Sequence, residues 1–278
     1  TFVLRNKLSL LLLLVAQQIF SQTIQQIESD LAHVYSKLRN VRESKPILWD
    51  SVELYKEQFE RKFLSYASKH PETFGHPFDS LRRLGVKIVC SEDKKFKIYC
   101  WDTYLGGTMY DFSNLFQYNN GDSIYSRMHI DSSVIKKIEQ PYIPSYSKIF
   151  EIKKEQKTYY LAIGNGIYSS KDCGQIIKVF NFENNYINDT CPIFKYNGTL
   201  ESSISIHFDV SDEKNRNAFM TNLIQCNNTK KTLKIPLIYR NKIIKHKYNT
   251  YKFNGKYFEV VKTSKINKGN RTRVIADF

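Results

Sequence analysis

The pattern of apolar residues changes within the stretch LRRLGVKIVC, residues 81–90. Before Gly85, apolar residues recur every three or four positions, which is the spacing of one face of an α-helix. After Gly85, short apolar runs are separated by turn-forming residues, which is typical of β-strands. The sequence therefore predicts an α+β protein in which an N-terminal antiparallel helical pair is followed by a large antiparallel β meander.

Upstream of this point the sequence predicts three helices. The first begins at Ile24 and presents one apolar face made of Ile27, Leu31, Val34, Leu38 and Val41. The second begins at Asp50, which would cap the helix together with Glu53, while Trp49 and Leu54 would form a hydrophobic staple. Its inward face would carry Tyr55, Phe59, Phe63, Tyr66 and Ala67. A short third helix runs from Asp79 to Leu84 and ends at Gly85.

Downstream of Gly85 the sequence predicts strands near 86–90, 95–102, 108–118, 122–130, 146–152, 157–164, 175–182, 186–195, 203–209, 218–225, 231–239, 242–253 and 256–262. Hairpin turns are expected at 119–121, 183–185 and 254–255, where Asn and Gly cluster. Short links between successive strands favour antiparallel pairing. A sandwich, a barrel and a propeller-like set of small sheets all remain open.

The N-terminus has the features of a secretory signal peptide. Arg5 and Lys7 precede the apolar run 8–15, which is too short to span a bilayer, and cleavage is expected after Ser21. A buried helix or a membrane anchor is the alternative. We therefore expect a signal peptide over 1–21, a helical segment over 22–85 that packs on the sheet, and an antiparallel β region over 86–278 in the same globular unit. The mature protein would be exported to the periplasm or the extracellular space, and soluble.

The chain is strongly basic, with 42 Lys and Arg residues against 27 Asp and Glu residues and a net charge of +15. Such an excess attracts acidic partners, here an acidic polysaccharide, an anionic envelope surface or another envelope protein, and export argues against nucleic acid. The alternative is a compositional bias that spreads lysines over solvated faces. The basic residues gather most clearly near the C-terminus, which we expect to be the electrostatic contact surface: Lys242, Lys245, Lys247, Lys252, Lys256, Lys262, Lys265, Lys268, Arg271 and Arg273.

The five cysteines are Cys90, Cys100, Cys173, Cys191 and Cys226. A hairpin that turns at Asp93 and Lys94 would place Cys90 opposite Lys97, so no bridge between Cys90 and Cys100 is predicted. Isolated buried thiols are the preferred interpretation. No cysteine pair has the spacing of a redox or zinc motif, and no cofactor is predicted.

The best ligand-site candidate combines Trp101, Asp102 and Thr103 with Gly106, Gly107 and Thr108. Paired glycines let a backbone approach a ligand closely, Trp offers a ring face, and Asp and Thr supply polar contacts. A tight corner between strands needs the same residue types. In that second interpretation Trp101 lies in the core and Asp102 accepts hydrogen bonds from loop amides.

Other candidate residues carry weaker signals. His70 and His76 flank a loop that a metal would need to close, but no third ligand is specified. His207 and Asp209 would share one face of a strand, without a nucleophile elbow nearby. The loop at 164–166 holds two glycines but no following helix, so no phosphate-binding motif is predicted. No catalytic residue is predicted.

Several stretches of this chain resemble the corresponding stretches in a group of secreted proteins from Bacteroidetes-type bacteria. The resemblance rests on the segments 74–78, 95–103, 106–109, 117–118, 159–161 and 251–258, and on the leader ending at 20–22. It implies an exported protein but no activity. Cys100 departs from the pattern, where a small polar residue is expected.

Three functions from different classes remain open at this point. The first is a non-enzymatic binding or interaction protein of the cell envelope, which the basic excess favours. The second is a secreted hydrolase, which needs two titratable groups converging in one pocket of the β region. The third is a structural envelope protein that docks through its N-terminal helices, which requires a large exposed apolar patch on them.

Overall fold

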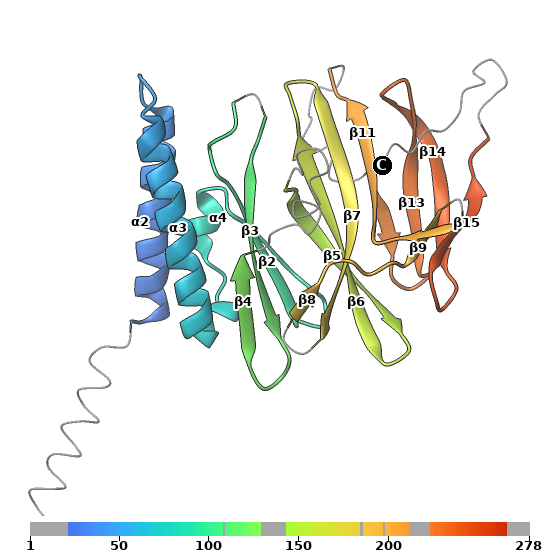
Figure 1. Ribbon diagram of the computed structural model, residues 1–278, viewed down its shortest axis with the longest axis horizontal. Helices are drawn as coiled ribbons and strands as arrows, with labels where there is room; N and C mark the ends of the chain where they lie inside the picture. Colours follow the sequence, from blue (N-terminus) through green and yellow to red (C-terminus); the bar gives the residue numbers. More distant parts are fainter. Residues whose placement is uncertain are drawn as a thin grey trace, which may run out of the picture.

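The computed structural model describes residues 22–107, 109–128, 143–183, 186–196, 198–211 and 223–265. The helices and strands carry the labels of Figure 1. The helical elements are α2 (Ile24–Glu43), α3 (Trp49–Lys69), the 3-10 helix η1 (Pro71–Phe74) and α4 (Asp79–Arg83). The strands are β1 (Lys87–Cys90), β2 (Phe96–Asp102), β3 (Phe112–Asn119), β4 (Ile124–Met128), β5 (Ser145–Lys154), β6 (Lys157–Ile167), β7 (Asp172–Glu183), β8 (Tyr186–Asn188), β9 (Phe194–Tyr196), β10 (Thr199–Glu201), β11 (Ser203–Asp209), β12 (Gln225–Asn227), β13 (Thr232–Tyr239), β14 (Lys242–Phe253) and β15 (Phe258–Thr263).

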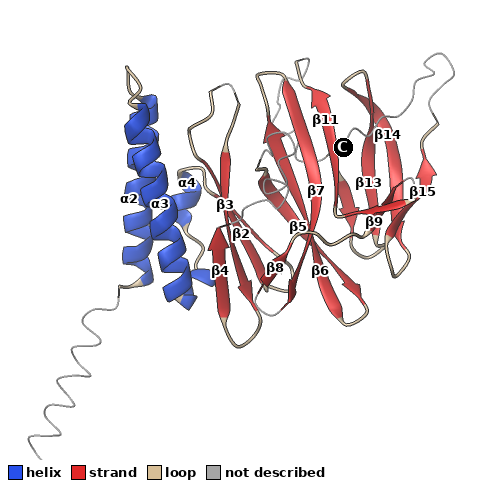
Figure 2. Cartoon of the chain, in the orientation of Figure 1, coloured by secondary structure: helices blue, strands red, loops and turns tan. Residues whose placement is uncertain are grey.

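These elements form four layers, with the helices at one end and three sheets stacked beside them (Figures 1 and 2). Sheet 1 has the strand order β1-β2-β3-β4, sheet 2 has β11-β7-β6-β5 with β8 beside β7, and sheet 3 has β10-β9-β15-β14-β13-β12. The predicted α+β class is confirmed. Of the three open β arrangements, the structure has stacked sheets of the sandwich type.

The helical pair packs its apolar face on sheet 1. Ile27, Leu31 and Leu38 of α2 join Phe59 and Phe63 of α3 in one core that is fully shielded from solvent. Each such residue stabilises the fold by about 1.5–3 kcal/mol through the apolar area it buries. The face predicted for α2 is confirmed, and so is the end of α4 near Gly85, which adopts φ +103.

The start of α3 differs from the prediction. The helix begins at Trp49 with Leu48 as its N-cap, and no side chain caps it. Asp50 therefore lies inside the first turn instead of capping it. The hydrophobic staple is absent too, because Trp49 and Leu54 are both exposed. In α2, by contrast, Thr23 and Gln26 make a complete capping box at the N-terminus.

Sheet 1 is covered on both faces, which explains the near-continuous apolar sequence of β2. Tyr99 and Trp101 face the helices, whereas Phe96, Ile98 and Cys100 face sheet 2. The alternation follows from the two-residue period of a strand. Sheet 1, with β2 inside it, thus separates two hydrophobic cores.

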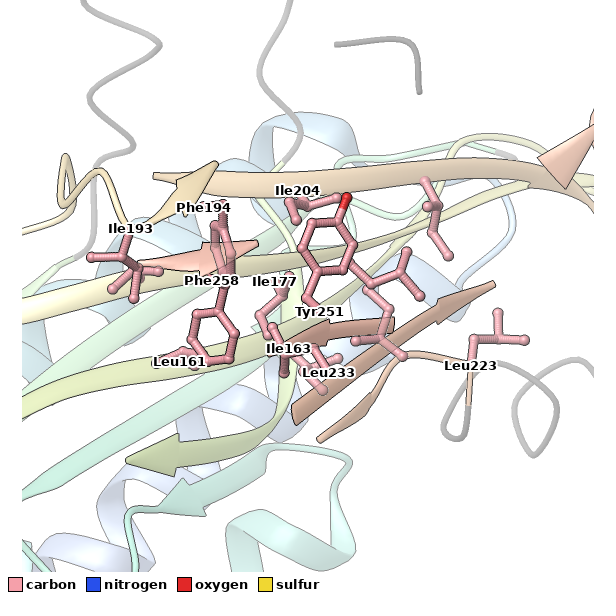
Figure 3. Close-up of a cluster of buried hydrophobic side chains, with 14 of the residues drawn as sticks. Leu161, Ile163, Ile177, Ile193, Phe194, Ile204, Leu223, Leu233, Tyr251 and Phe258 are labelled. Carbon is pink, nitrogen blue, oxygen red and sulfur yellow. The ribbon is translucent and has the colours of Figure 1, made fainter. Parts of the chain in front are cut away.

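A third core fills the space between sheets 2 and 3 (Figure 3). Leu161, Ile163 and Ile177 point from sheet 2 toward Leu233 and Tyr251 of sheet 3. The segment predicted as one strand over 186–195 is two strands, because β8 joins β7 while β9 pairs in parallel with β15. Strand β10 was not predicted.

The first hairpin has the predicted register, since Cys90 pairs with Lys97 across β1 and β2. None of the five cysteines forms a disulfide. Cys100, Cys173 and Cys191 are buried, as predicted, whereas Cys90 is exposed. None of the helices that the structure describes is both long enough and apolar enough to cross a membrane. The predicted signal peptide at 1–21 and the turn residues 184–185 lie outside the described residues, and so does most of the predicted strand 218–225.

Candidate functional site

The six predicted ligand-site residues divide into two groups. Trp101 is only 1% exposed and packs edge-on against Phe59, with ring centroids 5.2 Å apart. Thr103 is also buried, and its hydroxyl donates to Asp111 Oδ2 over 2.7 Å. Trp101 therefore belongs to the core, and a role in stacking on a ligand does not fit its position. Thr108 lies outside the described residues.

Asp102, Gly106 and Gly107, by contrast, line a cleft of about 460 Å³. One wall of the cleft is the loop between β2 and β3, which also contributes Tyr104, Met109 and Tyr110. The facing wall is the end of α2 and the turn before α3, formed by Arg42, Glu43, Ser44, Lys45 and Ile47. Both walls lie along the same edge of the layers, the upper one in Figure 1.

Backbone contacts fix the shape of the β2–β3 loop. The Tyr104 amide donates to Asp102 Oδ1 over 2.8 Å while Tyr104 itself has a left-handed backbone with φ 60. The Tyr110 amide donates to the carbonyl of Ile167 over 3.0 Å, which ties the loop to β6. The predicted hydrogen bond from a loop amide to Asp102 is therefore present.

The two glycines of the loop differ in what surrounds them. A Cβ built on Gly106 would lie 2.2 Å from the carbonyl oxygen of Met109, so the loop closes on itself there and admits no side chain. A Cβ on Gly107 would meet no atom within 4 Å. Gly106 therefore serves the turn, whereas Gly107 leaves the cleft open.

Asp102 is electrostatically unusual among the cleft residues. Burial and, to a smaller extent, the neighbouring Asp111 raise the pKa of its carboxyl to about 6, although the Tyr104 amide and the Arg42 charge lower it. A partly buried carboxyl with a displaced pKa in a cleft is a common property of functional sites. The Tyr35 hydroxyl also bonds the Asp102 carbonyl, over 3.2 Å.

A second candidate surface lies at the other end of the stack, on sheet 3. Residues 225–265 contain eleven Lys and Arg residues and one acidic residue, Glu259, a net charge of +10 out of +15 for the whole chain. The excess noted in the sequence is therefore concentrated in one sheet. The predicted surface residues Lys268, Arg271 and Arg273 lie outside the described residues.

Strand register places part of this charge on the outer face of sheet 3. Lys234 pairs with Thr250, which pairs with Lys262, so these three share one row across the sheet. Lys252 lies two residues further along β14 in the next row, between Thr232 of β13 and Glu259 of β15. The residues between them point the other way, into the core with sheet 2, and include Leu233 and Tyr251.

The outer face also carries aromatic rings. Lys234 Nζ lies 5.9 Å from the ring centre of Tyr248, and Lys195 Nζ lies 4.9 Å from that of Tyr257. No carboxylate of the described residues lies within ion-pair distance of Lys234, Lys252 or Lys262. These ammonium groups are therefore available to a partner.

The histidines are dispersed. His76 bonds Glu28 over 2.6 Å, and His70 bonds Glu72 over 3.2 Å, so each has its own carboxylate. His207 is exposed and stacks on Tyr168. Among the described residues, no three His, Cys, Asp or Glu side chains are grouped so as to hold a metal ion.

The loop at 164–166 is part of strand β6, and its Asn165 accepts a hydrogen bond from Gln175 inside the core. Sequence reasoning missed the facing wall of the cleft, Arg42 and Lys45, because no local signal links the end of a helix to a strand loop sixty residues later. Comparison of the chain with protein-family models, with curated proteins and with solved structures gives no significant match.

Proposed function

We propose that this protein is a non-enzymatic binding protein of the cell envelope that holds a linear acidic polysaccharide on the outer face of sheet 3. The observation that carries the proposal is the net charge of +10 within residues 225–265, part of which, at Lys234, Lys252 and Lys262, lies on the outer face of sheet 3 at the free end of the stack. Charge of one sign on one surface attracts a polyanion and raises its rate of encounter.

The spacing of the cations suits an extended chain. Neighbouring strands lie about 4.8 Å apart, so the backbone positions of Lys234 and Lys262, two strands apart, are separated by about 10 Å. Lys252 lies about 8 Å from both by the same geometry. A linear polyanion crossing the strands along the row of Lys234, Thr250 and Lys262 would meet an ammonium group on either side of Thr250. Lys252 in the next row would add a third, beside the carboxylate of Glu259.

The residues between the lysines favour a polysaccharide over an anionic bilayer. Thr232 pairs with Lys252 and Thr250 pairs with Lys234. Tyr248 lies two residues before Thr250 on β14, opposite Pro236, and its ring centre is 5.9 Å from Lys234 Nζ. Hydroxyl groups bond sugar hydroxyls, and a tyrosine ring offers an apolar face with a polar edge, which a sugar ring can cover. A bilayer surface would need the positive charge alone.

The two alternative functions have less support. The apolar faces of α2 and α3 are buried on sheet 1, so a docking role for the helices lacks the broad apolar patch that it requires. The hydrolase requires two titratable groups in one pocket; Asp102 and Glu43 both line the cleft, but the Glu43 carboxylate is held by Arg39 Nε at 2.7 Å. We therefore treat the cleft as a binding site.

The test is binding to immobilised polygalacturonate, with neutral dextran and phosphatidylglycerol vesicles as comparison surfaces. A triple variant, Lys234→Gln, Lys252→Gln and Lys262→Gln, should lose about tenfold or more in affinity, and wild-type affinity should fall as NaCl is raised because salt screens exposed charges. The matched control carries Lys69→Gln, Lys87→Gln and Lys95→Gln, three exposed lysines away from sheet 3. Equal losses in both triple variants, or binding to the vesicles alone, would overturn the proposal.

A further inference from the structure

The cleft between the α2–α3 turn and the β2–β3 loop contains opposite charges that do not pair with each other. Asp102 lines one wall and Arg42 the other, yet no ion pair joins them. The Arg42 charge lowers the pKa of the Asp102 carboxyl, against the larger effect of burial, which raises it. The space between the two charged groups is therefore open to a ligand that contacts both.

Each of the two groups is held in place by a contact that leaves its charge available. The Arg42 guanidinium lies over the ring of Trp49, 5.2 Å from its centre, and Asp102 accepts one hydrogen bond, through Oδ1. Among the described residues, nothing else bonds the Asp102 side chain. A carboxylate has about four acceptor positions and a guanidinium five donors, so both retain capacity for a ligand.

Part of the lining of the cleft is apolar. Ile47 and Met109 line the cleft, as does Tyr110, which is 43% exposed and stacks on Phe112. Lys45 adds a second cation to the Arg42 wall. The cleft is thus bipolar: one wall carries Arg42, Lys45 and Glu43, whose carboxylate is paired with Arg39, and the facing wall carries the Asp102 carboxylate.

We infer that the cleft binds a small zwitterion with an apolar body, of the amino-acid or dipeptide type. The ammonium group of the ligand bonds the Asp102 carboxylate, its carboxylate bonds Arg42, and its side chains contact Ile47, Met109 and Tyr110. A volume of about 460 Å³ falls in the usual range of small-molecule sites. Charge-assisted hydrogen bonds at both ends would set the orientation of the ligand.

This site is independent of the polysaccharide surface. The helices and sheet 3 occupy opposite ends of the layered stack, with sheets 1 and 2 between them (Figure 1). A zwitterion has no net charge, so the basic face of sheet 3 does not retain it. Failure of one proposal therefore leaves the other unaffected.

The experiment is calorimetric titration of the protein with L-leucyl-L-leucine, its N-acetyl derivative and its amide, and with free L-leucine. We expect the unmodified dipeptide or free leucine to bind. The acetylated and amidated dipeptides should bind at least about tenfold more weakly than the unmodified dipeptide, because each has lost one charged hydrogen-bonding group. Equal binding of all three dipeptides would overturn the proposal, as would the absence of binding by both zwitterions at millimolar concentration.

Three variants locate the binding. Asp102→Asn and Arg42→Gln should each weaken the dipeptide about tenfold or more. Gly107→Leu should abolish binding by filling the cleft, since its side chain meets open space and its backbone needs no positive φ. Matched controls are Asp122→Asn and Arg61→Gln, both exposed and outside this cleft. Thermal unfolding confirms that each variant is folded, and binding that survives all three cleft substitutions in folded protein contradicts the inference.

Discussion

Arg42 and Asp102 line the same cleft from opposite walls and do not form an ion pair. Trp49 holds the guanidinium on one side, and the Tyr104 amide holds the carboxylate on the other. The separation is maintained by rigid supports, because α2 packs on sheet 1 and the β2–β3 loop is bonded to β6 through Ile167. A cleft kept open in this way is pre-organised for a ligand that bridges the two charges.

Replacing Asp102 by Asn should stabilise the protein at neutral pH while it removes zwitterion binding. Burial raises the pKa of the folded-state carboxyl from 3.8 to about 6, so between these values the folded state binds more protons than the unfolded state. Stability therefore falls as pH rises through this window and stays lower above it. Asp111, Arg42, Tyr104 and Tyr35 surround the group and are unchanged by the substitution.

The measurement is thermal unfolding of wild type and Asp102→Asn at pH 4 and pH 7.5. The midpoints should be similar at pH 4, where the carboxyl is protonated in the folded state, and that of the variant should be higher at pH 7.5. A variant that is less stable at pH 7.5 would show that the ionised carboxylate supports the fold, and the pKa of Asp102 would then have the opposite displacement.

Truncation of Phe63 should be strongly destabilising. Its ring contacts those of Phe59, Phe78 and Trp101 in the core between the helices and sheet 1, and it is fully buried. Phe63→Ala should cost about 3–5 kcal/mol, by lost transfer free energy and the cavity left behind. Leu54→Ala, on the same helix but 58% exposed, should change stability by about 0.5 kcal/mol or less. Urea unfolding measures both, and similar losses would mean that α3 packs on the sheet through a different face.

A methyl group should be tolerated at Gly107 but not at Gly106. The Cβ of Gly106→Ala would meet the carbonyl oxygen of Met109, so the loop must shift at a cost of about 1–3 kcal/mol. Gly107→Ala should lie within about 0.5 kcal/mol of wild type because the space around it is open. Thermal unfolding compares the two, and equal stability would show that the loop does not close on itself at Gly106.

The thiols should differ sharply in reactivity. Cys90 is exposed, whereas Cys100, Cys173 and Cys191 are buried, and burial raises the pKa of the Cys100 thiol to about 12. Because the thiolate is the reactive form, Cys90 should be labelled first by a thiol reagent and the buried three only after unfolding. Mass spectrometry of peptides from the labelled protein identifies the sites. A denatured, unreduced protein with fewer than five reactive thiols would contradict the absence of disulfides.

The local sequence pattern was sufficient to predict most of the individual helices and strands. The segments 203–209 and 242–253 match β11 and β14, and turn placement alone put Cys90 opposite Lys97. Apolar periodicity and hairpin turns act over a few residues, so their consequences can be predicted from the sequence. The predicted start of α3 at Asp50 was wrong. Asp50 and Glu53 have the spacing of a capping box, but the helix begins one residue earlier, at Trp49.

The local sequence pattern did not predict which strands belong to the same sheet. Five residues separate β8 from β9, yet the two strands belong to different sheets. Strand β11, which follows both in the chain, pairs with β7 of sheet 2. An apolar strand face must be covered, but its sequence does not specify the element that covers it. For β2, which is apolar on both faces, the sequence leaves open that helices cover one face and sheet 2 the other.

The candidate sites divide in the same way. The sequence by itself determined the α+β class, the helix faces and the gathering of lysines toward the C-terminus, because each depends on residues close together in the chain. Only the tertiary structure decided that Trp101 is buried while Asp102, one residue later, lines a cleft opposite Arg42. Successive side chains of a strand point to opposite faces, and what each face meets depends on the packing of distant segments.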